Sequence, residues 1–257
     1  MLELTSMTWP DVRAALPSVK LAIVPIGSTE QHGPHLSLET DAAVANGLAH
    51  RLATELGDQA LLCPLMPYGL SEHHFAFPGS LTLRPATLIA LLKDIAESLV
   101  HWGVPRILVV NGHGGNTDAV RLAAREVRRD TGALMAHMMW SDVARDEAGK
   151  HVGDLGWGHA CEAETSVVMV VNPDGLRADR VPGPAPAPAL EPLAGPPFTG
   201  VDVPIRLDEW SPNGALGDPR LATPAAGEKI VEVTLARALD FAHRLIGYPL
   251  NPVTPLR

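Results

Sequence analysis

Four side chains of the kinds that bind metal ions lie close together in the sequence, namely Glu30, His32, His35 and Asp41. Imidazole and carboxylate are the ligand pair that zinc, manganese and ferrous iron share. Glu30 and His32, two residues apart in an extended segment, project from the same side of the chain. Asp41, at the start of a predicted helix, can offer its two oxygens to two ions. For an isolated Glu-x-His segment a polar loop with a helix cap is the simpler interpretation, so other clusters must decide.

A second cluster surrounds His113, which lies in the run Asn111-Gly112-His113-Gly114-Gly115-Asn116. The glycines leave the histidine free of bulky neighbours and allow positive φ angles in the loop. A glycine-rich phosphate loop at a helix start is the alternative. The run lacks the Lys-Ser/Thr ending of a P-loop and the spacing of a dinucleotide fingerprint. A metal-binding His113 explains it better.

A third cluster, His159-Ala160-Cys161-Glu162-Ala163-Glu164-Thr165-Ser166, stands at the entry to a predicted helix. Its carboxylates are also typical of a first helical turn, where they complement the helix dipole. Beside the other two clusters we expect it to complete the same site. Trp140 and Trp157 flank this region and either line the pocket or pack in the core. The segment Glu72-His73-His74 is equally consistent with a substrate contact and a solvated turn.

Strands and helices alternate around these clusters. Apolar runs ending in glycine or polar residues predict strands, and apolar periodicity with capping residues predicts the helices between them. This order requires parallel strands with right-handed crossovers, and therefore an α/β fold with helices on both faces of a central sheet. In such sheets the ligand crevice lies beyond the carboxyl ends of the strands, where the first two clusters fall. The predicted strands span 21–26, 60–65, 106–110 and 133–139, and the helices 40–57, 85–102, 116–130, 161–171 and 223–246.

Composition restricts the class of protein. The length of 257 residues fits a single domain spanning 1–257, and no apolar run approaches the roughly 18 residues that cross a bilayer. A formal charge of −9 offers no basic surface for nucleic acid. The N-terminus shows no secretory signal, which favours the cytoplasm. A stretch rich in Pro and Ala, 181–197, is expected to be an extended surface excursion and a candidate for subunit contacts.

The three clusters together resemble the creatininase family of metal-dependent amidohydrolases. The matching stretches are Gly27-Ser28-Thr29-Glu30-Gln31-His32-Gly33-Pro34-His35 with Thr40-Asp41, then Asn111 to Asn116, then His159 to Ser166. The resemblance implies a three-layer α/β/α fold around a mostly parallel sheet, assembled as a homo-oligomer, often a hexamer. It also implies two divalent ions bridged by an aspartate. Glu30, Asp41 and His113 would hold one ion, and His32 and Asp41 the other.

The sequence departs from creatininase proper at Gly115, where that enzyme has a glutamate that binds the second metal. A carboxylate must then come from elsewhere. We expect it to be Glu162, which lies one helical turn from His159 and so can face the same side. Glu164 matches the glutamate that the family generally keeps, as a ligand or as an orienting partner. The pattern is similar to branches that act on other substrates, such as a formamide deformylase and a peptidase that trims a redox-cofactor precursor.

The resemblance and the residues together predict a hydrolase of a carbon–nitrogen bond in a small amide, formamide or cyclic amide. A metal-bridged hydroxide would attack the carbonyl, and His159 would move the proton to the departing nitrogen. Zinc, manganese and iron all suit these ligands. A metallopeptidase acting on a short peptide and a catalytically silent metal-binding assembly subunit are the alternatives. A two-metal phosphatase is disfavoured, since no lysine or arginine lies within the three clusters to hold a phosphate.

Overall fold

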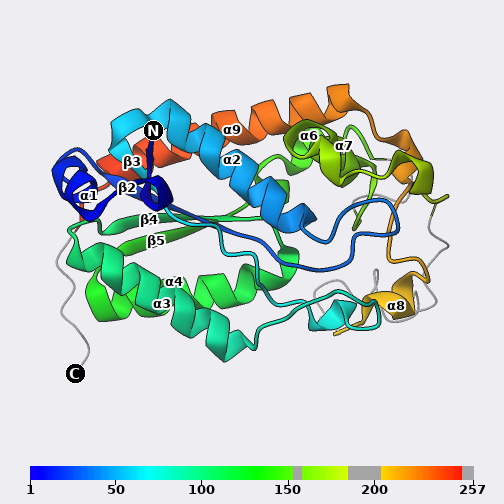
Figure 1. Ribbon diagram of the computed structural model, residues 1–257, viewed down its shortest axis with the longest axis horizontal. Helices are drawn as coiled ribbons and strands as arrows, with labels where there is room; N and C mark the ends of the chain where they lie inside the picture. Colours follow the sequence, from blue (N-terminus) through cyan, green and yellow to red (C-terminus); the bar gives the residue numbers. More distant parts are fainter. Residues whose placement is uncertain (153–157, 185–203, 251–257) are drawn as a thin grey trace.

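A five-stranded parallel sheet divides the molecule into two helical layers (Figure 1). The computed structural model describes residues 1–152, 158–184 and 204–250. The strand order is β1-β3-β2-β4-β5, and every pairing is parallel. This confirms the predicted α/β/α class. The strands are β1 (Leu2–Glu3), β2 (Leu21–Ile26), β3 (Ala60–Leu62), β4 (Arg106–Asn111) and β5 (Leu134–Met139).

Helices cover both faces of this sheet. Three of them, α2 (Thr40–Leu56), α7 (Glu162–Val171) and α9 (Pro224–Gly247), lie on one face, at the top of Figure 1. Two others, α3 (Pro85–His101) and α4 (Thr117–Thr131), lie on the opposite face. The shorter helices are α1 (Trp9–Ala15), α5 (Trp140–Val143), α6 (Arg145–Ala148) and α8 (Leu207–Trp210).

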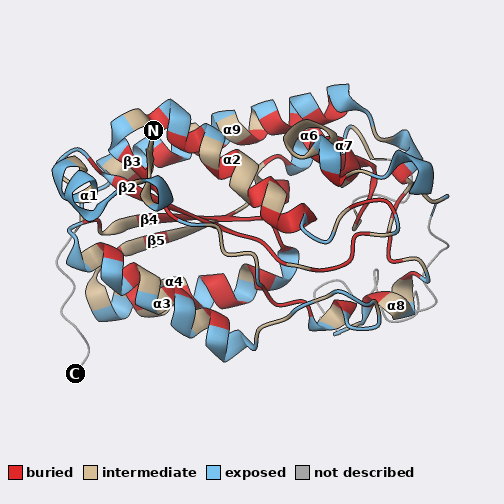
Figure 2. Ribbon diagram, viewed as in Figure 1, coloured by how far each residue is buried: buried red, intermediate tan, exposed pale blue. Residues whose placement is uncertain are grey.

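β2 is apolar along its whole length, and β4 is apolar between Arg106 and Asn111, as expected for strands that are covered on both faces. Successive side chains of a strand point to opposite faces. Ile23 and Leu108 therefore join the core beneath α2, α7 and α9, whereas Val24 and Val109 join the core beneath α3 and α4. Figure 2 shows the buried sheet between helices whose outer faces are exposed. The continuous apolar runs in the sequence are thus the signature of a sheet buried on both sides.

The strand predicted for residues 60–65 is shorter in the structure. β3 ends at Leu62, and Pro64, which has no backbone N–H, stands in the remaining part. The chain nevertheless stays beside β2, because Met66 N–H donates to the carbonyl of Pro25 and forms an isolated bridge with Ile26. The short edge strand β1 was not predicted.

The register brings two strand ends to the same level. Ile26, the last residue of β2, pairs with Asn111, the last residue of β4. From β2 the chain continues to β3 on one side, while β4 lies on the other side. The carboxyl ends of β2 and β4 therefore form the switch point where open α/β sheets bind ligands. Both of the first two clusters follow these strand ends directly.

Within the described residues, no helix combines the length and apolarity needed to cross a membrane. Trp157 and residues 185–203, which include most of the predicted surface excursion, lie outside the described part of the chain.

Candidate metal centre

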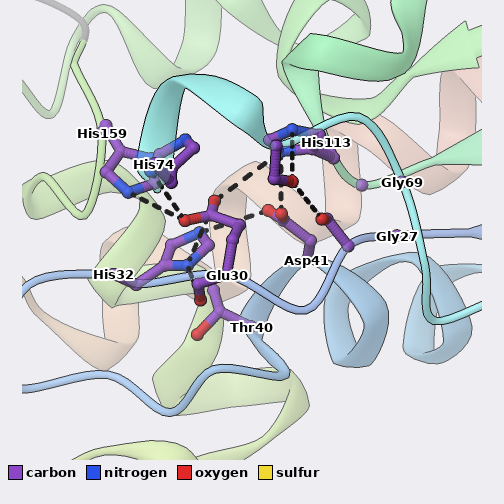
Figure 3. A network of polar contacts seen from close by, with 12 residues as sticks. Gly27, Glu30, His32, Thr40, Asp41, Gly69, His74, His113 and His159 are labelled. Carbon is purple, nitrogen blue, oxygen red and sulfur yellow. Dashed lines mark hydrogen bonds and ion pairs between the residues drawn. The ribbon is translucent and has the colours of Figure 1, made fainter. Parts of the chain in front are cut away.

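Side chains from four segments converge at the carboxyl ends of β2 and β4 (Figure 3). The loop after β2 supplies Glu30 and His32, and the first turn of α2 supplies Asp41. The loop after β4 supplies His113, and the first turn of α7 supplies Glu164. The first four are buried, and the side chain of Glu164 is 12% exposed. The structure thus brings residues 134 positions apart into one polar cluster inside the protein.

Asp41 lies between two groups of possible ligands. Its Oδ2 atom is 2.9 Å from His113 Nδ1, and its Oδ1 atom is 3.2 Å from His32 Nε2. Glu30 Oε1 lies 3.6 Å from His113 Nδ1, and Glu164 Oε1 lies 3.7 Å from His32 Nε2. Ligand atoms lie within 4.8 Å of one another both in the group Glu30, Asp41 and His113 and in the group His32, Asp41 and Glu164. An aspartate shared by two triplets is the arrangement that the sequence predicted for Asp41.

Several atoms in this cluster are buried without a hydrogen-bond partner. They include both carboxylate oxygens of Glu30, Nε2 of His32 and Oδ2 of Asp41. Burial of an ionised carboxylate costs several kcal/mol unless the charge is compensated. Divalent cations compensate such charges, and carboxylate and imidazole are ligands that zinc, manganese and iron accept. The residues present therefore fit a metal centre.

Two glycines allow Asp41 to reach the end of the sheet. A Cβ atom on Gly27 would lie 2.3 Å from the backbone nitrogen of Ala42. A Cβ atom on Gly112 would lie 2.0 Å from the carbonyl oxygen of Asp41. Any side chain at either position would push the first turn of α2 away from β2 and β4. These glycines explain how the start of α2 comes close enough to place Asp41 between the two triplets.

The charges of the cluster perturb its pKa values strongly. Burial raises the pKa of Glu30 well above its usual value. Burial also opposes ionisation of Asp41 and Glu164, but the nearby His32, together with His113 at Asp41, lowers the pKa of both carboxyl groups. Burial alone would lower the pKa of His32, yet the surrounding carboxylates raise it well above its usual value. A cation must displace the proton of His32, so ion binding should weaken in acid.

His159 lies beside this cluster, as predicted, and lines the cavity described below. Its Nε2 atom is 2.8 Å from the carbonyl oxygen of Gln31 and 3.7 Å from Glu30 Oε2, and its ring centroid is 4.3 Å from that of His32. Burial lowers the pKa of His159 to about 4. We expected a group that titrates near neutral pH. The structure instead favours a neutral imidazole that donates its Nε2 proton to Gln31.

Glu164, rather than Glu162, faces the cluster. We predicted Glu162 as the replacement ligand, but its Oε2 atom accepts a hydrogen bond from the backbone N–H of Asp218 (2.8 Å). In the described part of the chain it belongs to none of the converging groups. Residues two apart in a helix point in nearly opposite directions, so one of the two carboxylates must turn away. Glu164 Oε2 also accepts a hydrogen bond from the N–H of Ala160, whose φ of 50° turns it toward that carboxylate.

His74 is a site residue that sequence reasoning left undecided. It ends the 3-10 helix η3 (Glu72–His74) and is 2% exposed, which excludes the solvated turn for this residue. Its Nδ1 atom lies 3.0 Å from Glu30 Oε2 and 2.9 Å from Gln31 Nε2. Burial holds the pKa of His74 well below its usual value. The local sequence around His74 does not reveal that this side chain is buried, because its burial depends on contacts with segments far away in the sequence.

A cavity of about 300 Å³ opens onto the cluster. Trp140, buried in the core, also borders this cavity, and its indole N–H donates to the carbonyl of Gly112 (3.3 Å). Arg145, which the sequence clusters did not include, lies at the cavity and forms an ion pair with Asp142 (2.5 Å). The titratable residues of the site and of η3 that line this cavity are Asp41, His73, His74, His113, His159 and Glu164.

Comparisons with known proteins agree over most of the chain. A family model for creatininase, described as creatinine amidohydrolase, matches residues 5–242. A mycofactocin precursor peptide peptidase from Mycobacterium ulcerans (strain Agy99) is 35% identical over 238 residues, covering 89% of this chain and 85% of that protein. The creatinine amidohydrolase of Pseudomonas putida is 29% identical over 255 residues, covering 91% and 93%. The solved structure of a mutant creatininase of Zn-Zn type has a TM-score of 0.80 at 27% identity, covering 96% of this chain and 98% of that chain.

Proposed function

Because this chain belongs to the creatininase family, we propose that it is a metal-dependent amidohydrolase that cleaves a carbon–nitrogen bond in a small amide, formamide or cyclic amide. The observation that carries the proposal is the position of Asp41, which lies between two triplets of buried metal-binding side chains. A single-ion site or a helix cap would not need a second triplet.

Two divalent ions would be held by the two triplets. Glu30, Asp41 and His113 form one site, and His32, Asp41 and Glu164 form the other. When bound, such ions lower the pKa of water so that a nucleophile exists at neutral pH, and they polarise a carbonyl oxygen. Zinc, manganese and iron are all compatible with these ligands, and the similar solved structures include a creatininase of Zn-Zn type and a manganese creatininase.

The protein side chains supply orientation and proton transfer. The cavity opens onto the two triplets, so the carbonyl of a small substrate bound there would lie beside them. His159 donates Nε2–H to the carbonyl of Gln31, so the lone pair of the neutral ring is on Nδ1. In this mechanism Nδ1 accepts the proton of the attacking water and passes it to the departing nitrogen.

Hydrolysis of a short peptide is the second candidate. It is favoured by the 35% identity with a mycofactocin precursor peptide peptidase, against 29% with a creatinine amidohydrolase.

The experiment that tests these functions is a substrate panel on protein loaded with zinc, manganese or iron. The panel contains formamides, lactams, creatinine and short peptides, and products are identified by mass spectrometry. Turnover of a small amide that is lost in Asp41→Asn supports the first function, and turnover of peptides alone selects the second. Turnover of creatinine would contradict the inference from Gly115 that this chain differs from creatininase proper in its substrate. Full metal content without any turnover in the panel would favour the silent metal-binding subunit.

A further inference from the structure

The chain at Leu70, the ring of His113 and His73 of the 3-10 helix η3 occupy the space into which a side chain at position 115 would extend. A Cβ atom on Gly115 would lie 2.3 Å from the carbonyl oxygen of Leu70, 2.6 Å from His113 Nε2 and 3.0 Å from His73 Cε1. The ring of His73 is also stacked on that of His113, with centroids 5.6 Å apart. The absence of a side chain at Gly115 therefore lets η3 pack against the His113 loop.

This packing brings the second imidazole of η3 to Glu30. His74 Nδ1 lies 3.0 Å from Glu30 Oε2, as Figure 3 shows, and its ring centroid lies 5.9 Å from that of His113. His74 thus adjoins two members of the triplet Glu30, Asp41 and His113.

Hydrogen bonding around His74 indicates that its Nδ1 atom carries no proton. Gln31 Oε1 accepts a hydrogen bond from the N–H of Gly33 (2.9 Å), which orients the amide nitrogen of Gln31 toward His74 Nδ1 (2.9 Å) and the Gly214 carbonyl (3.2 Å). The amide nitrogen of Gln31 is also 3.1 Å from His159 Nε2, but that atom donates its proton to the carbonyl of Gln31 (2.8 Å). The two amide hydrogens are then directed to the Gly214 carbonyl and to His74 Nδ1, which accepts. Glu30 Oε2 is then 3.0 Å from an unprotonated nitrogen, and it is buried without a hydrogen-bond partner. Two electron-pair donors at this distance repel each other unless a proton or a metal cation lies between them, and a metal cation bound by both would remove the repulsion.

We infer that His74 is a further ligand of the ion held by Glu30, Asp41 and His113. The inference rests on the proposed function, since it assigns a residue to one of the two proposed ion sites. It also changes the kind of ion that the site accepts. With His74 this site has two carboxylates and two imidazoles, whereas without it the site has two carboxylates and one imidazole. Imidazole suits zinc and iron, and carboxylate suits manganese, so His74 should raise the preference for zinc.

The test measures ion affinity in three variants of the full chain. His74→Gln removes the imidazole at similar volume, His74→Glu replaces it with a carboxylate, and His73→Gln is the matched control in the same 3-10 helix. After removal of bound ions with a chelator, zinc and manganese affinities are measured by competition and by elemental analysis. Circular dichroism verifies that each variant is folded. The visible absorption of the cobalt-loaded protein reports the loss of a nitrogen ligand directly.

We expect His74→Gln to weaken binding of one of two zinc ions by more than about 100-fold, beyond the range typical of a residue that only orients a ligand. Its cobalt spectrum should change as well. His73→Gln should change zinc affinity by no more than about twofold, as expected for a substitution outside the ligand set. The ratio of zinc to manganese affinity should fall in His74→Glu by about tenfold or more.

Unchanged zinc affinity and an unchanged cobalt spectrum in folded His74→Gln would overturn the inference while leaving the proposed function intact. A larger effect of His73→Gln than of His74→Gln would also overturn it. Failure of the unaltered chain to bind any divalent ion would instead contradict the proposed function itself.

Discussion

Substitution of Gly112 by alanine should weaken ion binding at both sites much more than it lowers the stability of the fold. The added methyl group would lie 2.0 Å from the carbonyl oxygen of Asp41, whereas real Cβ atoms essentially never approach another atom within 3.0 Å. The first turn of α2 must therefore move by at least about 1 Å relative to β4. Because Asp41 belongs to both triplets, this movement should weaken both ion sites at once.

The expected size follows from that displacement. Overpacking of this kind costs about 1–3 kcal/mol of stability, and a misplacement of about 1 Å at a catalytic centre costs roughly 100-fold in rate. For a chain of 257 residues the stability loss lowers the melting temperature by about 2–4 °C per kcal/mol. Ion content measured by elemental analysis should fall more sharply than thermal stability.

Gly114→Ala is the matched control, because a Cβ atom at Gly114 meets nothing within 4 Å. Both variants would be examined by elemental analysis, calorimetry and the substrate panel. Equal ion content and equal turnover in Gly112→Ala and Gly114→Ala would refute the reasoning that backbone contact at Gly112 positions Asp41.

Three further predictions follow from the site. Burial and the nearby His32 lower the pKa of His35 from 6.5 to about 4. Between pH 6.5 and pH 4 this imidazole therefore binds a proton in the unfolded chain but not in the folded one, so the free energy of unfolding decreases as the pH falls. The loss in free energy of unfolding is about 3 kcal/mol by pH 4. Urea unfolding with a chelator present should show a smaller loss in His35→Gln than in the unaltered chain. An equal loss in both would contradict the lowered pKa of His35. Chelation should lower the melting temperature, since an ion at 100 times its Kd stabilises by about 2.7 kcal/mol, and an unchanged calorimetric transition would count against a bound ion. His159→Gln should lower kcat by about 100-fold to 10,000-fold with both ions retained, so that loss of an ion in this variant would make His159 a ligand instead.

Much of the fold follows from local sequence signals. The strand predicted at 21–26 coincides with β2, and the helices predicted at 40–57 and 85–102 each end within one residue of α2 and α3. Continuous apolar runs and a proline or glycine at the boundaries specify these elements strongly. The two-residue strand β1 has no such signal, because its pairing with β3 depends on the tertiary structure.

The sequence predicted most of the residues of the site, but not all of the contacts between them. Glu30, His32, Asp41 and His113 come together because the register of β2 and β4 brings two loops to one edge. The choice between Glu162 and Glu164 depends on the rotation of α7, which residue types do not reveal. The contact of His74 with Glu30 depends on packing of η3 against Gly115, between segments that are far apart in the sequence.

Three expectations from the sequence stay predictions. They are a single domain over residues 1–257, a cytoplasmic location and assembly as a homo-oligomer, possibly a hexamer. Light scattering of the purified protein would measure the last of these directly.

The most direct test of the central claim is the number of metal ions bound per chain in the unaltered protein and in Asp41→Asn. Because both triplets include Asp41, we predict two ions per chain in the unaltered protein and the loss of at least one, with loss of amide hydrolysis, in the variant. Two ions per chain in Asp41→Asn, at unchanged affinity, would contradict the account.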